Sequence, residues 1–218
     1  MQTETQTQNL VKLDNLLDID SLKRAEIEII LDHAVSMEEV LNRDIKKVPS
    51  LRGKTIVTLF YESSTRTRVS FEQAGKILSA DVININNKTS SNNKGESLYN
   101  TALTIQAIGA DVVIIRHPHS GAPHFISKHI KTSVINAGDG THAHPTQALL
   151  DLYTIKKKVG SIEGKNIVLV GDILYSRVAR SHMWGLSKLG ANITICGPET
   201  LIPNDFIKGL KNISGHPF

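Results

Sequence analysis

Residues 55–85 read TIVTLFYESSTRTRVSFEQAGKILSADVINI and contain two apolar runs separated by a polar loop and a helical stretch. The runs Thr55–Phe60 and Val82–Ile85 have the length of strands, and Arg66–Leu78 between them has the apolar spacing of a helix. A helix that joins two short apolar runs is typical of a right-handed crossover between parallel strands. This stretch therefore predicts an α/β fold.

The same alternation extends on both sides of that stretch. A helical pattern follows Asp20, and either Asp20 or Ser21 is expected to cap it. Further elements are expected at Glu96–Ile108 (helix), Val112–Ile115 (strand), Pro123–His129 (helix), Val134–Asn136 (strand), Pro145–Lys156 (helix), Ile167–Val170 (strand), Arg177–Leu189 (helix), Ile193–Cys196 (strand) and near Phe206 (a weak helix). This order predicts a parallel sheet covered by helices on both faces.

A polar stretch with two glycines, Lys156–Lys165, interrupts the alternation and indicates a domain boundary. We expect a polar tail at residues 1–9, a first domain at 10–155 and a second, similar α/β domain at 156–218. The second unit offers only two strands and one strong helix, which bury too little surface to stand alone. We therefore expect the chain to stop inside its second domain.

Composition restricts the classes of function. With 40% hydrophobic and 21% charged residues in 218, the chain is expected to be globular. The net charge of +4 fits a small anionic ligand, whereas 5% aromatic residues and no basic run interleaved with aromatics argue against nucleic acid. Because no apolar run approaches about 18 residues and Met1–Asn9 lacks a signal-peptide pattern, we expect a cytoplasmic protein without a membrane span. The single cysteine, Cys196, is expected in the core.

The loops that follow the strands carry the candidate site, because ligands bind beyond the carboxyl ends of strands in open α/β sheets. After the first strand, Ser64 and Thr65 lie at the start of a helix, followed by Arg66, Thr67 and Arg68. Hydroxyls, free N–H groups and a guanidinium at a helix N-terminus suit a phosphate. An ordinary cap followed by two solvent-exposed arginines is the alternative.

Later strands end in polar residues too. Arg116 ends the third strand, and His144 and Gln147 flank the start of the helix that Pro145 opens. A histidine there can donate to a polarised carbonyl, and a glutamine can accept from an –NH2 group, although either could be a simple polar cap. Lys94 lies in a polar loop that could equally be a plain surface loop.

Metal and dinucleotide sites are not expected. The histidines lack an obvious cysteine or carboxylate partner at zinc-ligand spacing, so no metal is predicted. The segment around Gly171 and Arg177 is not a Gly-x-Gly-x-x-Gly motif, so no cofactor is predicted. These histidines are His117, His119, His142 and His144.

Taken together, these segments resemble the aspartate and ornithine carbamoyltransferase family, and specifically its aspartate branch. The matching stretches are Phe60–Glu72 (FYESSTRTRVSFE), Ser90–Thr101 (SSNNKGESLYNT), Arg116–Pro118 (RHP), His144–Ile155 (HPTQALLDLYTI) and Gly171–Ser181 (GDILYSRVARS). The resemblance covers about Leu10 to Pro198. Family members continue for roughly a further third of a chain, so the resemblance also implies a C-terminal truncation.

The resemblance implies transfer of the carbamoyl group of carbamoyl phosphate to the α-amine of L-aspartate, a step of pyrimidine biosynthesis, without metal or cofactor. It implies that phosphate binds to Ser64, Thr65, Arg66, Thr67 and Arg116, that Arg66, Thr67 and His144 are catalytic at the carbonyl, and that Gln147 orients the carbamoyl amide. Arg177 would hold an aspartate carboxylate. Ser90 would bind carbamoyl phosphate and Lys94 would bind aspartate, both in a neighbouring subunit's site of a homotrimer. Regulatory chains are possible partners.

Two alternatives stay open. An ornithine carbamoyltransferase would share the phosphate loop but not the Lys94 loop, and a non-catalytic fragment would only bind carbamoyl phosphate. Because the second domain is expected to be incomplete, we expect weak binding of carbamoyl phosphate or phosphate and little carbamoylation of aspartate.

Overall fold

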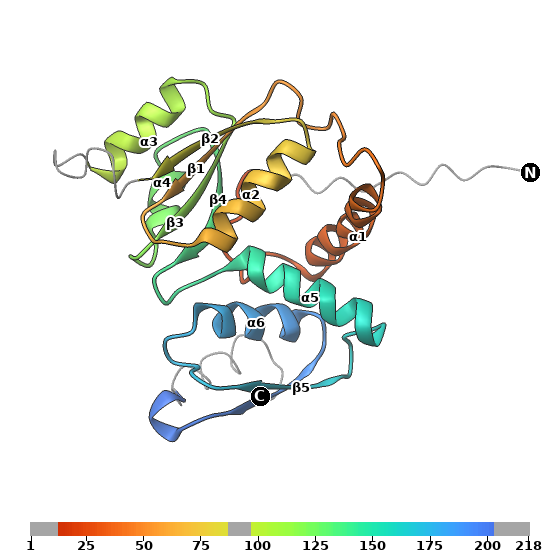
Figure 1. The fold of residues 1–218 in the computed structure, drawn as a ribbon. Helices are drawn as coiled ribbons and strands as arrows, with labels where there is room; N and C mark the ends of the chain where they lie inside the picture. The colour runs from red at the N-terminus through yellow and green to blue at the C-terminus, as the bar shows by residue number, and fades with distance from the viewer. Residues whose placement is uncertain (1–12, 87–96, 203–218) are drawn as a thin grey trace, which may run out of the picture.

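The computed structural model describes residues 13–86 and 97–202, and its main sheet is parallel throughout (Figure 1). The strands lie in the order β2-β1-β3-β4, with bounds β1 (Thr55–Phe60), β2 (Asp81–Asn86), β3 (Val112–His117) and β4 (Ser133–Asp139). Strand β1 lies between β2 and β3, with Val57 opposite both Ile83 and Val113. All four carboxyl ends therefore meet at one edge of the sheet.

Helices cover both faces of this sheet, and alternate residues of β1 are therefore buried on opposite sides. Ile56 and Phe60 pack in the same cluster as Phe71 of α2 (Thr65–Ile77). Val57 and Leu59 belong to a cluster on α3 (Leu98–Ala107) and α4 (Ala122–Ser127). The predicted α/β class, with a parallel sheet covered on both faces, is confirmed.

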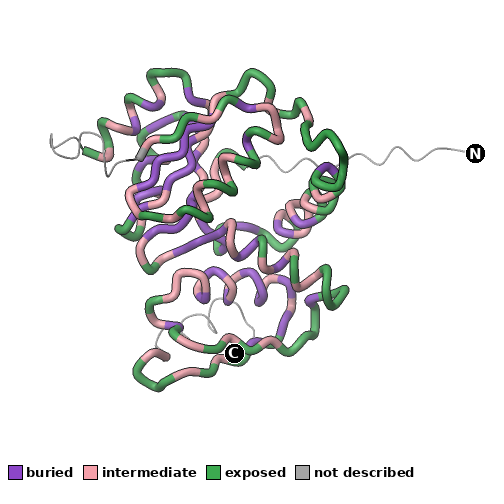
Figure 2. The backbone as a smooth tube through the Cα atoms, in the orientation of Figure 1, coloured by how far each residue is buried: buried purple, intermediate pink, exposed green. Residues whose placement is uncertain are grey.

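A second core joins the sheet domain to the C-terminal part of the chain. It is built from Ile27 of α1 (Arg24–Leu41), Leu152 of α5 (Pro145–Val159) and Leu186 of α6 (Arg177–Lys188). Below α6 lies a parallel pair, β5 (Asn166–Val170) and β6 (Asn192–Cys196), followed by a short 3₁₀ turn at Glu199–Leu201 (Figure 1). One face of the pair packs on α6, and the other is exposed (Figure 2).

Several sequence predictions differ from the structure. Helix α1 begins at Arg24 with Lys23 as its N-cap, so the predicted cap at Asp20 or Ser21 is wrong. The reason is local: the Asp18 carboxylate accepts the Ser21 N–H at 2.9 Å and closes a separate turn. Helix α5 continues to Val159 instead of ending at Lys156.

The core assignment of Cys196 is also wrong. Cys196 ends β6 as predicted, but it is exposed, because it shares a strand face with Thr194 and points away from α6. The tail at residues 1–9 and the helix near Phe206 lie outside the described residues, and the boundary at 155/156 stays a prediction. No helix within residues 13–86 and 97–202 is long and apolar enough to cross a bilayer.

The junction of α5 and α6 gives a first prediction. Leu152 is fully buried, and a Cβ added to Gly185 would lie 2.7 Å from its Cδ1, so the two helices pack closely there. Leu152→Ala is expected to lower the free energy of unfolding by about 3 kcal/mol, the cost of a core cavity. Leu150→Ala, on the exposed side of the same helix (55% exposed), is expected to change it by less than about 0.5 kcal/mol. Urea denaturation of both variants checks this, and equal losses would contradict the packing.

Candidate active site

A cavity of about 820 Å³ opens at the carboxyl edge of the sheet, between the start of α2, the end of β3 and the start of α5. It brings together six of the residues predicted from sequence: Ser64, Arg66, Thr67, Arg116, His144 and Gln147. Ser70, Phe71, Ala74, Thr146, Leu150 and Val178 complete its wall. The residues come from segments far apart in the sequence, from Ser64 to Val178, so the fold itself assembles the site.

The first turn of α2 is left open toward this cavity. Ser64 is the N-cap residue, but its side chain makes no capping hydrogen bond and instead donates from Oγ to Thr67 Oγ1 at 2.8 Å. Arg66 is exposed, and no carboxylate of the described residues pairs with it. The helix start therefore offers N–H groups, hydroxyls and an unneutralised guanidinium to an anion.

Two further arginines are held together by a carboxylate. Glu62 Oε2 lies 3.0 Å from Arg116 Nε and 2.9 Å from Arg177 Nη2. Burial, followed by the nearby charge of Arg177, lowers the pKa of Arg116, whereas Glu62 opposes the shift. Because two cations share one anion, the cluster keeps an excess of positive charge at the cavity.

Backbone groups complete the arrangement of the two guanidinium groups. Arg116 Nη1 donates to the Ala137 carbonyl at 3.2 Å, and Arg177 Nη1 donates to the Gly140 carbonyl at 3.1 Å. Gly138 has φ of +111°, and a Cβ there would lie 3.0 Å from Arg177 Cζ. Only glycine lets the arginine approach the backbone so closely.

His144 is held in a defined position at the start of α5. Its backbone N–H donates to Ser181 Oγ at 2.9 Å, and its Nδ1 lies 3.4 Å from Thr146 Oγ1. Burial, followed by the charges of Arg116 and Arg177, lowers the pKa of His144 to about 4. The imidazole is therefore neutral at pH 7, with one N–H to donate.

Gln147, one turn further, is oriented by a carboxylate. Its Nε2 donates to Asp151 Oδ1 at 3.0 Å, and Asp151 Oδ2 lies 2.7 Å from His182 Nε2 on α6. Because the amide nitrogen is engaged, Gln147 Oε1 is left to accept a hydrogen bond from a ligand.

Not every predicted residue lines this cavity. Thr65 lines a neighbouring hollow of about 110 Å³ with Ser64 and Arg68, and Arg177 reaches the site through Glu62. Ser90 and Lys94 lie outside the described residues. Sequence reasoning missed Glu62, Gly138 and Ser181; a carboxylate directly before the Ser-Ser-Thr-Arg segment was the available signal for Glu62.

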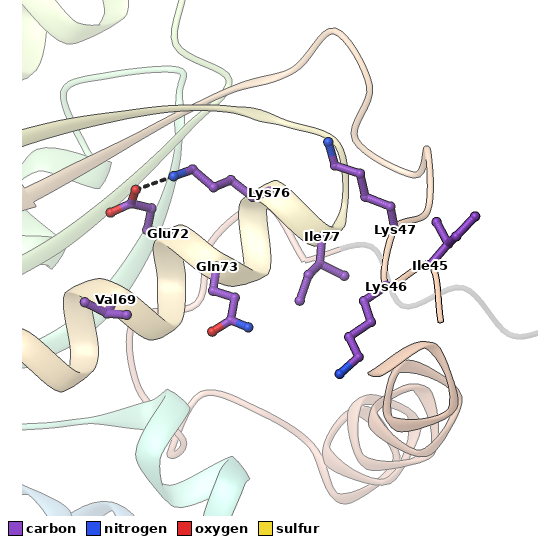
Figure 3. A pocket seen from close by; sticks show the side chains of 8 residues that line it. All are labelled: Ile45, Lys46, Lys47, Val69, Glu72, Gln73, Lys76 and Ile77. Atoms are coloured by element: carbon purple, nitrogen blue, oxygen red, sulfur yellow. Dashed lines mark hydrogen bonds and ion pairs between the residues drawn. The ribbon is translucent and has the colours of Figure 1, made fainter. Parts of the chain in front are cut away.

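A second cavity, of about 550 Å³, lies at the other end of α2 (Figure 3). Lys46, Lys47 and Lys76 line this cavity together with apolar residues, but Lys76 is already paired with Glu72 at 2.6 Å. This cavity contains none of the predicted residues and lies away from the carboxyl edge, where α/β sheets bind ligands. The geometry therefore favours the larger cavity.

The state of His144 gives a second prediction. We expect its ring resonances in NMR to titrate near pH 4 and not between pH 6 and 8. Since the unfolded state binds the proton more readily, the free energy of unfolding falls as pH drops from about 6.5 to 4, by at most about 1.4 kcal/mol per pH unit. Phosphate should raise this pKa by neutralising the charge of Arg116, which lines the cavity. A His144 pKa near 6.5 without ligand would contradict the described burial.

Comparison with known proteins decides the family. A profile described as "Aspartate/ornithine carbamoyltransferase, carbamoyl-P binding domain" matches residues 14–157. The chain belongs to the aspartate/ornithine carbamoyltransferase family. It is 57% identical over 198 residues to the aspartate carbamoyltransferase catalytic subunit of Heliobacterium modesticaldum, covering 90% of this chain and 64% of that protein. The chain thus spans less than two thirds of the length of this curated relative.

Solved structures of this family agree with the fold. The catalytic subunit of M. jannaschii aspartate transcarbamoylase superimposes with a TM-score of 0.84 at 42% identity, covering 94% of this chain and 67% of that one. Trypanosoma cruzi aspartate transcarbamoylase in complex with carbamoyl phosphate and aspartate gives 0.83 at 32% identity, covering 93% and 65%. Its complex with N-(phosphonacetyl)-L-aspartate gives 0.84 at 31% identity, covering 93% and 67%.

Proposed function

We propose that this chain forms the carbamoyl phosphate site of an aspartate carbamoyltransferase. The observation that carries the proposal is the convergence of Arg66, Arg116 and His144 on one cavity at the carboxyl edge of the sheet. Relatives named for this activity, and solved relatives with carbamoyl phosphate and aspartate bound, support it. We propose that this carbamoyl transfer is a step of pyrimidine biosynthesis and that it takes place in the cytoplasm.

Different residues of the cavity bind the phosphate group and the carbonyl group of carbamoyl phosphate. Ser64 and Thr67 bind the phosphate oxygens through their hydroxyls, and Arg116 adds a charged contact. Thr65, beside the cavity, contributes its backbone N–H in the first turn of α2. Arg66 binds the bridging side of the phosphate and neutralises it as it leaves. Positioned donors of this kind stabilise charge that develops in the transition state.

The acyl carbon reacts without a covalent enzyme intermediate. The neutral α-amine of aspartate attacks it, the new C–N bond forms as the C–O bond to phosphate breaks, and the proton lost by the amine passes to the departing phosphate. Arg66, Thr67 and the neutral His144 donate to the carbonyl oxygen, and Gln147 accepts from the carbamoyl –NH2. Holding the two substrates in line supplies much of the acceleration.

Aspartate is the acceptor that the charges favour. Arg116 and Arg177 share a single carboxylate, Glu62, so the acceptor side is electropositive. This excess suits a dicarboxylate and repels a cationic side chain such as that of ornithine. Lys94 and Ser90 are proposed to complete a neighbouring site in a homotrimer with shared active sites, which regulatory chains could join.

Calorimetry on the 218-residue chain tests this function. Carbamoyl phosphate is expected to bind at 1:1 stoichiometry, and N-(phosphonacetyl)-L-aspartate is expected to bind at least 10-fold more tightly than phosphonoacetate, because its aspartate part reaches Arg177. Arg177→Gln should remove this difference while changing phosphonoacetate affinity less than about 3-fold. Absence of carbamoyl phosphate binding would refute the phosphate site, and equal affinity for both phosphonates would refute the aspartate assignment.

A further inference from the structure

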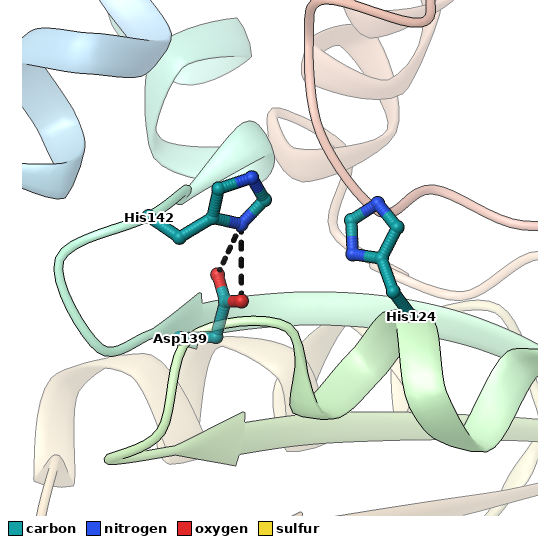
Figure 4. Close-up of side chains that lie close together, drawn as sticks. All are labelled: His124, Asp139 and His142. Carbon is teal, nitrogen blue, oxygen red and sulfur yellow. Dashed lines mark hydrogen bonds and ion pairs between the residues drawn. The ribbon is translucent and has the colours of Figure 1, made fainter.

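A cluster of two histidines and an aspartate lies beside the candidate active site but does not line its cavity. His124 comes from α4, Asp139 from the end of β4, and His142 from the loop that precedes α5 (Figure 4). One potential ligand atom from each residue lies within 4.8 Å of the other two. The fold therefore brings α4 and the stretch at residues 139–142 together at one point.

The state of His124 indicates a ligand. Its Nε2 lies 2.8 Å from Asp18 Oδ2, so the ring donates its N–H there and Nδ1 carries the lone pair. Nδ1 is buried and has no hydrogen-bond partner among the described residues. In Figure 4 a ring nitrogen of His124 faces the other two side chains. A buried acceptor without a donor is costly, and a cation would satisfy it.

Asp139 is prepared as a fixed ligand. It is fully buried, and its carboxylate accepts from Asn136 Nδ2 at 2.8 Å, from Gly121 N at 2.6 Å and from Ala143 N at 3.1 Å. Its Oδ2 lies 3.1 Å from His142 Nδ1, where a cation can take the place of the shared proton. The surrounding donors orient the carboxylate as the outer partners of metal ligands do.

We propose that His124, Asp139 and His142 bind a divalent transition-metal cation, zinc by ligand type, with water in the fourth position. Two imidazoles and one carboxylate form a known zinc donor set. The Asp18–His124 pair reproduces the arrangement in which a ligating histidine donates its other N–H to a carboxylate. The site does not depend on the function proposed above.

A cation can enter the cluster from solvent, and the ligand atoms are close enough to bind it after small rotations of the rings. The side chains of His142 and His124 are 40% and 33% exposed, so a cation can enter from solvent. Ligand atoms around tetrahedral zinc lie about 3.4 Å apart for bonds of about 2.0–2.2 Å, so the two rings must rotate inward. The cation would clamp α4, β4 and the loop that carries His144.

The test uses the metal-free 218-residue chain in a Cys196→Ser background, because exposed Cys196 could bind zinc on its own. Zn²⁺ is expected to bind at 1:1 stoichiometry in calorimetry and to raise the melting temperature by about 5–10 °C at saturation. Co²⁺ should give the visible absorption of a four-coordinate site. If no 1:1 binding of Zn²⁺ is detected up to millimolar concentration, the proposal is overturned, and the three side chains form only a hydrogen-bonded cluster.

Matched variants locate the site. His142→Ala and His124→Ala are each expected to weaken Zn²⁺ binding at least 30-fold, and Asp18→Asn about 10-fold. His33→Ala, an exposed histidine on α1, is expected to bind as the parent does. Circular dichroism spectra are to be recorded to check that each variant is folded. Zinc affinity unchanged in both folded cluster variants would overturn the proposal.

Discussion

The Arg66→Ala variant is expected to bind carbamoyl phosphate on the order of 100-fold more weakly than the parent chain and to keep its melting temperature. Arg66 is exposed, and no described carboxylate pairs with it, so its removal costs the fold little. A bidentate, charge-assisted contact with phosphate contributes about 3 kcal/mol, which corresponds to that loss of affinity. Calorimetry and thermal denaturation measure the two effects.

Two control variants distinguish the contribution of the planar guanidinium of Arg66 from that of its charge and its position. Arg66→Lys keeps the charge but not the planar fork, so most of the loss should remain. Arg52→Ala removes an exposed arginine before β1, at the opposite edge of the sheet, and should leave affinity unchanged. Near-parental affinity in Arg66→Ala would contradict the proposed phosphate site.

Glu62→Gln is expected to lower the free energy of unfolding by about 3 kcal/mol, because it leaves two largely buried arginines without their shared anion. The side chains of Arg116 and Arg177 are only 15% and 14% exposed, so solvent screens their repulsion poorly. Phosphate should then bind more tightly, on the order of 10-fold, since it replaces the missing negative charge. Urea denaturation with and without phosphate checks both effects.

The control for this variant is a carboxylate in an exposed ion pair. Glu163→Gln breaks the contact with Arg24, where Glu163 is 64% exposed, and is expected to lower the free energy of unfolding far less than Glu62→Gln does, because solvent screens this ion pair. The affinity of this variant for phosphate is expected to equal that of the parent chain. If Glu62→Gln proved as stable as Glu163→Gln, the arginine pair would not be held as described.

The fold was predictable from sequence where apolar runs were short and bounded by polar loops. Strand β1 has the predicted bounds, Thr55–Phe60, because Lys54 and Tyr61 mark its ends. The start of α1 was not predictable, because Asp18 forms a turn with Ser21 that imitates a helix cap. The face on which Cys196 lies depends on packing against α6, which strand periodicity alone does not reveal.

Much of the candidate site was predictable for a topological reason. Parallel strands place their carboxyl ends together, so Arg66, Arg116 and His144 could be grouped without coordinates. Glu62 is marked in the sequence only by its place before the Ser-Ser-Thr-Arg segment, and Gly138 is not marked at all, because the roles of both depend on distances to Arg177, which is far along the chain. Asp139 lies three residues before His142 and could have been paired with it from sequence, whereas the approach of His124 to both arises only in the fold.

A crystal structure of the chain with carbamoyl phosphate tests the central claim most directly. We expect the phosphate at the first turn of α2, in contact with Arg66 and Arg116, with the carbonyl oxygen within hydrogen-bond distance of His144. Carbamoyl phosphate bound instead between Lys46, Lys47 and Lys76, or anywhere other than the cavity at the carboxyl edge, would contradict the account.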